Sequence, residues 1–365
     1  MSPDQSQECI LIFEDKQENF EQLAAPLEER IDPDDYYIEL FDGEESARED
    51  ESDSEFVMRL MEEHNYPLLV ILDAELNQYT QSTVRKADVK DACTELGVPL
   101  CVYHRDEGEY SNPENIKESE DHIIRLDPKS GHASMAKSCA GIIRGFATIR
   151  TTLEEYMTDA SPDALLEPPS KFIEELDDVP VNAKANLDKY SWGQSESVGL
   201  IMDGEGKSDM IRRKSTILGY WIYNQLLEYP GVLVNTVAAA SYLGVDHETF
   251  QEEEAFYEPL EEARYNGPFS DVDNWWWTAE IDGILADHTT PEDGNIITGR
   301  EFFSREGMEI GPAICLEDHN EAGYYCVLTE SPVCEEHSVS PEAWIPAGAS
   351  LTRISESEYM KLSGW

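Results

Sequence analysis

The segment PLLVILD, residues 67–73, decides the fold of the first half of this chain. It is an apolar run with the length of a buried strand, and it ends in one carboxylate. A second apolar run, CILIF at residues 9–13, is followed by the acidic pair Glu14 and Asp15. Ligands of open α/β sheets bind outside the carboxyl ends of the strands. We therefore expect Glu14, Asp15 and Asp73 to share one pocket for a cation or a phosphoryl group.

Strand-like and helix-like patterns alternate through residues 1–157. Apolar residues recur at helical spacing, as in Phe20, Leu23 and Leu27, between short apolar runs rich in Ile, Leu and Val. Such alternation predicts a parallel sheet with helices on both faces. We expect strands over 9–13, 36–41, 68–72, 99–103 and 123–126, and helices over 19–31, 55–63, 83–96 and 134–156.

The charge of the chain is unusual. Its 77 Asp and Glu against 26 Lys and Arg give a net charge of −51, while 40% of the residues are hydrophobic. The apolar runs argue against disorder as the cause. In molar salt the Debye length falls to about 3 Å, which screens the self-repulsion of an acidic surface. The composition therefore indicates a halophilic protein and argues against a nucleic-acid partner.

No targeting or membrane segment is expected. The first ten residues, MSPDQSQECI, lack the basic and apolar regions of a signal peptide. No apolar run reaches the roughly 18 residues that a membrane span needs. The seven cysteines are widely spaced, which is typical of free thiols in a reducing compartment. These features predict a cytoplasmic protein without a membrane partner.

The first half resembles the receiver domain of response regulators, which has a flavodoxin-like fold. Glu14 and Asp15 stand where receivers keep their acidic pair, and FDGEESA at residues 41–47 resembles the segment after their second strand. Asp73 stands at the phosphoacceptor position. The resemblance implies a five-stranded parallel sheet, Mg²⁺ held by these three carboxylates, and attack of a carboxylate oxygen on a phosphoryl group. Oxygen ligands suit such a hard cation.

Two switch positions depart from the receiver pattern. Receivers carry Ser or Thr at the end of the fourth strand and Lys before Pro at the end of the fifth, but His104 and Asp127 stand there. A carboxylate at the second position would repel a phosphoryl group. The resemblance therefore implies a degenerate receiver that keeps the fold and has lost the switch. Two simpler interpretations stay open: Asp73 caps a turn, and Glu14 with Asp15 is a solvated acidic pair.

The second half predicts a mixed α+β region. Residues 158–210 are acidic and interrupted by prolines, which favours a linker with short helices. Residues 211–295 form a helical segment, in which helices over 235–243 and 247–263 resemble a helix-turn-helix. Between 215 and 299 Arg264 is the one Lys or Arg, so the phosphate contacts of DNA binding are missing. Residues 296–365 are expected to form a β-rich tail.

Two further groups in the second half are candidate sites. Trp275, Trp276 and Trp277 are expected to form a core or, alternatively, a protein or ligand interface. In a helix at least one of the three indoles would reach a second surface. The tail carries two Cys/His pairs that can close a tetrahedral zinc site. Buried thiols with ordinary histidines are the alternative. The zinc candidates are Cys315, His319, Cys334 and His337.

Three functions compete on this evidence. We expect a non-catalytic regulatory or adaptor protein in signal transduction that binds protein partners, with homo-oligomerisation open. The first alternative is a phosphorelay response regulator phosphorylated on Asp73. The second is an enzyme or a zinc-binding effector in the C-terminal half, although the sequence contains no strong nucleophile–base motif. The resemblance favours the first reading, because it accounts for both the fold and the substituted switch positions.

Overall fold

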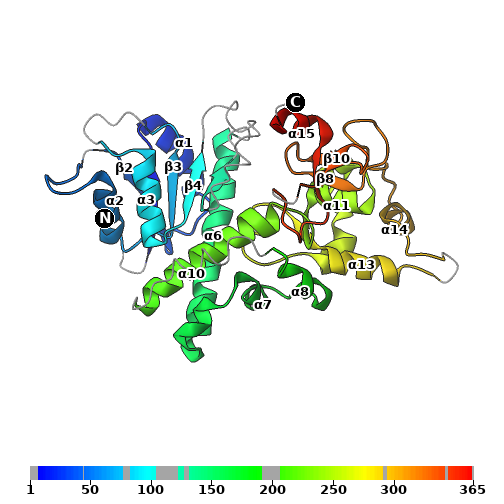
Figure 1. Ribbon diagram of the computed structural model, residues 1–365, viewed down its shortest axis with the longest axis horizontal. Helices are drawn as coiled ribbons and strands as arrows, with labels where there is room; N and C mark the ends of the chain where they lie inside the picture. The colour runs from blue at the N-terminus through cyan, green and yellow to red at the C-terminus, as the bar shows by residue number, and fades with distance from the viewer. Residues whose placement is uncertain are drawn as a thin grey trace. The chain divides into compact units, whose positions relative to one another are not determined.

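A computed structural model describes most of the chain (Figure 1). His104 and Asp127, the two substituted switch positions, lie outside the described residues. None of the helices in the described part is both long and apolar enough to cross a membrane. The described ranges are 7–43, 45–76, 83–103, 122–126, 131–190, 206–290, 294–341 and 344–363.

The described residues fall into two compact units. The first contains the residues up to 167 together with 206–220, and the second contains 168–190 and the residues from 221 onward. Part of the segment expected as a linker therefore belongs to each unit. Residues 211–220, expected within a separate helical domain, pack in the first.

The first unit is built on a five-stranded, fully parallel sheet, as the sequence predicts. The strand order is β2-β1-β3-β4-β5, so the direction in which strands are added reverses between β1 and β3. Strands and helices begin and end within a few residues of the expected positions. They are β1 (Glu8–Phe13), α1 (Gln17–Glu28), β2 (Tyr36–Phe41), α2 (Asp53–Glu63), β3 (Leu69–Asp73), α3 (Lys86–Leu96), β4 (Leu100–Tyr103), β5 (Ile124–Leu126), α6 (Gly131–Asp159) and η2 (Pro162–Leu166).

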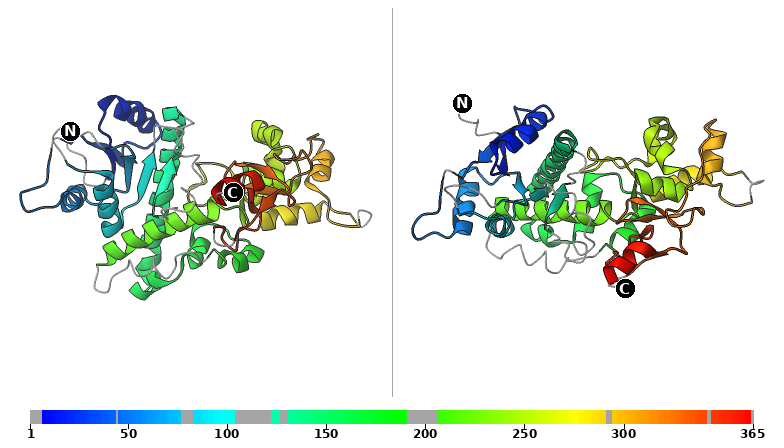
Figure 2. Two further views of the ribbon diagram at one scale, coloured as in Figure 1. Left: turned by 45° about the horizontal axis from the view of Figure 1, so that its top comes forward. Right: turned by 90° about the horizontal axis from the view of Figure 1, so that it is seen from above.

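Helices cover both faces of this sheet. All five residues of β3 are buried, which is what an unbroken apolar run in a parallel sheet predicts. Phe13, Leu72 and Val102 belong to a core with residues of α2 and α3. Because side chains alternate along a strand, the next residue of each strand faces the opposite side. There α1 and α6 pack against each other (Figure 2).

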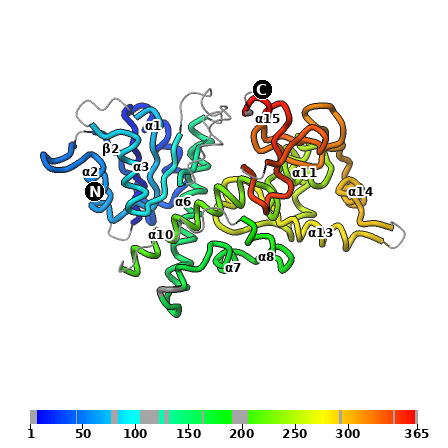
Figure 3. Tube along the Cα trace, in the orientation of Figure 1, coloured from blue at the N-terminus to red at the C-terminus, as the bar shows by residue number. Residues whose placement is uncertain are grey.

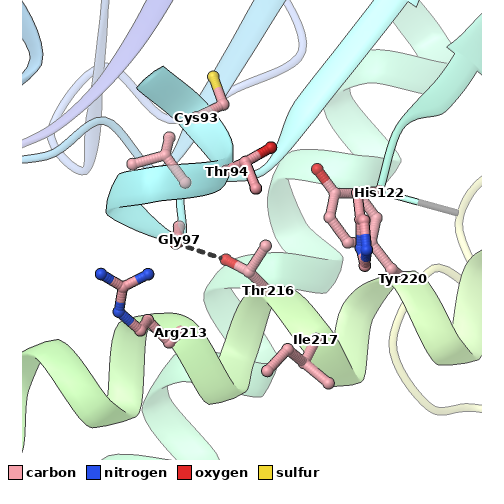
Figure 4. A pocket seen from close by; sticks show the side chains of 9 residues that line it. Cys93, Thr94, Gly97, His122, Arg213, Thr216, Ile217 and Tyr220 are labelled. Atoms are coloured by element: carbon pink, nitrogen blue, oxygen red, sulfur yellow. Dashed lines mark hydrogen bonds between the residues drawn. The ribbon is translucent and has the colours of Figure 1, made fainter. Parts of the chain in front are cut away.

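Helix α10 (Lys207–Trp221) packs on the first unit and covers the end of α3. The Arg212 Nε donates to the Leu96 carbonyl at 2.8 Å, and the Thr216 hydroxyl donates to the Gly97 carbonyl at 2.8 Å (Figure 4). These side chains satisfy carbonyls that the last turn of a helix leaves without partners. The Tyr220 hydroxyl accepts from the Leu100 amide at 2.8 Å, which attaches α10 to β4.

The basic triplet of the sequence is buried in this contact. Arg212, Arg213 and Lys214 are 8%, 7% and 2% exposed. The Arg212 guanidinium lies 3.9 Å from the centre of the Tyr66 ring. The Lys214 ammonium donates to the Glu167 carbonyl, and burial lowers its pKa from 10.5 to about 8. The triplet is a packing element and presents no basic patch.

The second unit contains short helices and two small sheets. Strands β6 (Leu233–Asn235) and β7 (Trp275–Trp277) are antiparallel. A mixed sheet has the order β10-β11-β8-β9, from β8 (Tyr324–Cys326), β9 (Ser331–Val333), β10 (Ser338–Val339) and β11 (Thr352–Ser355). The helices are η3 (Pro169–Lys171), α7 (Ile173–Leu176), α8 (Val181–Leu187), η4 (Ile222–Leu227), α11 (Thr236–Leu243), α12 (His247–Glu252), η5 (Glu254–Phe256), η6 (Glu258–Ala263), α13 (Thr278–Asp287), α14 (Gly299–Arg305) and α15 (Glu356–Ser363). Figure 3 traces the chain of this unit and labels α11, α13, α14 and α15.

One expected helix of the second unit is shorter than the sequence indicated. Helix α11 ends at Gly244 in the left-handed conformation, and Asp246 caps α12 by accepting from the Thr249 amide. The expected helix over 247–263 was wrong in its second half, because α12 ends at Glu252 and two 3₁₀ turns follow. Proline at residue 259 cannot donate to a continuing helix, so it begins a new turn instead.

Substitution of Gly97 tests the packing of α10. Gly97 has φ +65°, and a Cβ there would lie 2.6 Å from the Arg213 Cγ. Gly244 has nearly the same backbone, φ +68°, but open space around it. We expect Gly97→Ala to lower the free energy of unfolding by about 1–3 kcal/mol more than Gly244→Ala does. The reason is that the added Cβ meets Arg213 at position 97 and open space at position 244. Denaturant unfolding in molar KCl measures both. Equal costs would contradict the α10 contact.

Candidate functional site

Three side chains stand in one row at the carboxyl edge of the sheet. Phe13 of β1 is level with Leu72 of β3, so Glu14, the next residue, stands level with Asp73. Asp73 is in turn paired with Tyr103 at the end of β4. Side chains level with each other in a sheet share a face. The sheet therefore brings Glu14, Asp73 and Tyr103 together, although they are far apart in sequence.

Tyr103 extends over the end of β3. Its hydroxyl donates a hydrogen bond to the Glu14 Oε2. Because β4 and β1 flank β3 and adjacent strands are about 4.8 Å apart, the phenol must cross the position of Asp73 to reach Glu14. Asp73 is 0% exposed and Glu14 is 2% exposed. The carboxylate expected to accept a phosphoryl group is thus covered.

Local hydrogen bonds partly compensate the buried charge. The Glu14 Oε1 accepts from the Lys16 amide at 2.9 Å and from the Asn19 side-chain amide at 3.3 Å. The Asp73 Oδ1 accepts from the Glu75 amide at 3.0 Å. This last bond is an Asx turn, so Asp73 does cap the loop that follows its strand. The capping role and a ligand role are compatible, because each carboxylate oxygen has two lone pairs.

The acidic group has the dimensions of a cation site. Glu14, Asp15 and Asp73 each offer an oxygen, and these oxygens lie within 4.8 Å of one another. Oxygen-only ligands suit Mg²⁺ or Ca²⁺, whose metal–oxygen distances are about 2.0–2.6 Å. Buried like charges are costly without a counter-charge. The residues present therefore fit the hard divalent cation that the sequence suggested.

The cysteine and histidine candidates are only partly brought together. Cys315, Cys334 and His337 converge in the second unit, and the fourth member of their group is Asp318. His319 is exposed, has φ +61° and is not in the group. The sequence does contain a signal for Asp318: two residues separate it from Cys315, as two residues separate His337 from Cys334.

The three tryptophans form strand β7 and not a helix. Trp275, Trp276 and Trp277 are 6%, 0% and 2% exposed. Trp276 packs against the rings of Phe250 and Tyr257. The indoles therefore contribute to the core of the second unit.

A cavity between α3, α10 and His122 is too small to be a ligand site (Figure 4). Its lining includes Cys93, Thr216 and Tyr220. Its volume of about 20 Å³ is room for about one water molecule.

Comparisons with known proteins do not assign a role to this site, so its interpretation rests on the geometry described above. A scan against models of protein families finds no matching family, and a search of curated proteins finds no match.

Loss of the Tyr103 hydroxyl is expected to destabilise the first unit. Tyr103→Phe keeps the ring but leaves the buried Glu14 carboxylate without one donor, which costs about 1.5–3 kcal/mol for a hydrogen bond to a charged group. Tyr66→Phe is the matched control, because Arg212 contacts the ring face there. Denaturant unfolding should show little change for the control. Equal effects of the two substitutions would contradict the proposed bond.

Magnesium should stabilise the protein through the acidic group. A ligand that binds only the folded state adds about 2.7 kcal/mol at a hundredfold excess over its Kd. We expect MgCl₂ to raise the Tm in molar KCl, and Asp73→Asn to remove most of this rise. Glu75→Gln, which changes an exposed neighbouring carboxylate, should keep it. A wild-type Tm that responds only to ionic strength would contradict a cation site.

Proposed function

We propose that this chain is a non-catalytic regulatory or adaptor protein, built on a flavodoxin-like receiver unit that is not phosphorylated on Asp73. It acts through contacts with a protein partner, and its acidic pocket holds Mg²⁺. The resemblance in sequence supports the receiver unit. The geometry of the pocket supports the bound Mg²⁺ and the absence of phosphorylation on Asp73.

The strand order supports the receiver assignment. The order 2-1-3-4-5 is that of flavodoxin-like sheets, in which ligands bind where the order of strands reverses. Here that point lies between β1 and β3. Glu14, Asp15 and Asp73 stand at the carboxyl ends of these two strands.

The burial of Asp73 carries the proposal. In-line attack on a phosphodonor requires the donor to approach a carboxylate oxygen. Asp73 is fully buried, one of its oxygens accepts from the Glu75 amide, and Tyr103 crosses above it to Glu14. A phosphodonor would have to displace the phenol and break its bond to Glu14. In the sequence, His104 and Asp127 replace the Ser or Thr and the Lys with which receivers contact the phosphoryl group.

The distribution of charge favours a protein partner over a nucleic acid. Phosphate contacts need accessible Lys and Arg, but Arg212, Arg213 and Lys214 are buried against the first unit. With a net charge of −51, the surface repels polyanions at low salt and offers them no attraction at high salt.

A phosphodonor assay tests the proposal. The chain is incubated with Mg²⁺ and acetyl phosphate in molar KCl, and intact mass is measured for the wild type and Asp73→Asn. We expect neither protein to gain a phosphoryl adduct. A receiver protein known to react, tested in the same buffer, shows that the assay works.

An adduct on the wild type that is absent from Asp73→Asn would overturn the proposal in favour of a phosphorelay regulator. Tyr103→Ala adds a second measurement. An adduct on this variant alone would assign the loss of reactivity to the covering phenol.

A further inference from the structure

Four side chains of the second unit meet at distances that a metal ion would bridge. The His337 Nδ1 lies 3.2 Å from the Asp318 Oδ2 and 3.3 Å from the Cys334 Sγ. The Cys334 Sγ lies 3.9 Å from the Asp318 Oδ1. With the Cys315 Sγ, the four ligand atoms are all within 4.8 Å of one another.

These distances match the edges of a zinc tetrahedron. Zinc binds thiolate sulfur at about 2.3 Å and imidazole nitrogen or carboxylate oxygen at about 2.0–2.2 Å. With tetrahedral angles, the ligand atoms are then separated by about 3.3–3.8 Å. The two contacts of His337 fall at the short end of this range or just below it, and the contact between sulfur and carboxylate falls just above it.

The spacing along the chain gives independent support. Cys315 and Asp318 are separated by two residues, Cys334 and His337 are also separated by two, and 15 residues lie between the pairs. Zinc sites of the form C-x₂-C-x₁₅₋₂₀-C-x₂-C have this arrangement. In this chain Asp and His take the second position of each pair, and both are zinc ligands in proteins.

The backbone prepares the first pair for a ligand. The Cys315 carbonyl accepts from the His319 amide at 3.1 Å, and the Cys315 amide donates to the Asn320 carbonyl at 2.7 Å. His319, at φ +61°, makes the turn between them. Donation from the Asn320 amide to Asp318 lowers the pKa of that carboxyl. His319 thus has a role in the turn, and Asp318 presents the carboxylate.

The second pair is tied to the first. The Cys334 amide donates to the Cys315 Sγ at 3.2 Å. The Ser338 hydroxyl donates to the Cys334 carbonyl at 2.6 Å, and the Glu356 amide donates to the His337 carbonyl at 2.9 Å. Such outer-shell bonds orient metal ligands.

The core cluster that contains Cys315 and Cys334 is small. The strands of the mixed sheet have two to four residues. Small cores of this kind are commonly stabilised by a metal or by disulfides, and all seven cysteines are free thiols. The core cluster consists of Ala313, Cys315, Ala322, Cys326, Val333 and Cys334.

We infer that Cys315, Asp318, Cys334 and His337 form a closed structural zinc site that holds the C-terminal sheet together. Thiolates select zinc over Mg²⁺ or Ca²⁺. Four protein ligands leave no open position for a substrate, which distinguishes a structural site from a catalytic one. The ion would offset the charge of two thiolates and a carboxylate in a largely buried place. The inference is independent of the function proposed for the first unit.

Metal analysis of the full chain tests the site. Protein purified in molar KCl without chelators, then passed over a desalting column, should carry about one zinc per chain by plasma mass spectrometry. Removal of zinc with a chelator should lower the Tm, and added Zn²⁺ should restore it. Added Co²⁺ should give the visible absorption of a tetrahedral thiolate site.

Four substitutions distinguish ligands from neighbours. Cys315→Ser and Asp318→Ala should each lower bound zinc at least tenfold. His319→Ala and Cys326→Ser should retain it, because the first changes an exposed turn residue and the second a buried thiol outside the group. If a ligand variant fails to fold, Co²⁺ titration of the stripped wild type still tests the site.

Three outcomes would overturn the inference. One is a wild-type protein that carries no zinc and takes up neither Zn²⁺ nor Co²⁺. Another is a disulfide between Cys315 and Cys334 in the native protein, seen by mass spectrometry without reductant. The third is loss of zinc in His319→Ala with retention in Asp318→Ala.

Discussion

Burial of carboxylates at the end of a sheet is the constraint on which the first unit depends. Glu14 and Asp73 are almost completely inaccessible, and an isolated buried charge would be far too costly to keep. Backbone amides, the Asn19 amide and the Tyr103 hydroxyl reduce that cost. The same arrangement that stabilises the charges covers Asp73. Stabilisation of these charges and the inaccessibility of Asp73 therefore have one physical cause.

Side-chain donors of α10 solve a related problem at the end of α3, where carbonyls lack partners within their own helix. The carbonyls of Leu96 and Gly97 point away from their own helix, and side chains of α10 supply the donors. A short basic triplet in an acidic chain suggests a binding patch when only its composition is considered. Two of its head groups have partners inside the unit: Arg212 meets a carbonyl, a carboxylate and an aromatic ring, and Lys214 meets a carbonyl. Charged side chains in this chain thus have two roles: they keep the surface solvated, and in the interior they cap the ends of helices.

In the second unit, the spacing of residues along the sequence was not enough to predict which side chains converge. The pairing of Cys315 with His319 rested on residue types, because His is a commoner zinc ligand than Asp. The turn at His319 instead places Asp318 beside His337. Similarly, the three tryptophans were expected to reach two surfaces because a helix turns by about 100° per residue. Strand pairing with β6 and packing from both sides bury all three.

The sequence by itself determined the parallel sheet, its helices and the edge at which the carboxylates gather. These follow from local patterns: apolar runs of strand length, helical periodicity and a polar residue directly after each run. Only the tertiary structure decided what those carboxylates meet. Strand register places Tyr103 beside Asp73, and chain folding places α10 on α3 and Asp318 beside His337. Such contacts join residues that are distant in sequence, so no local pattern of residue types encodes them.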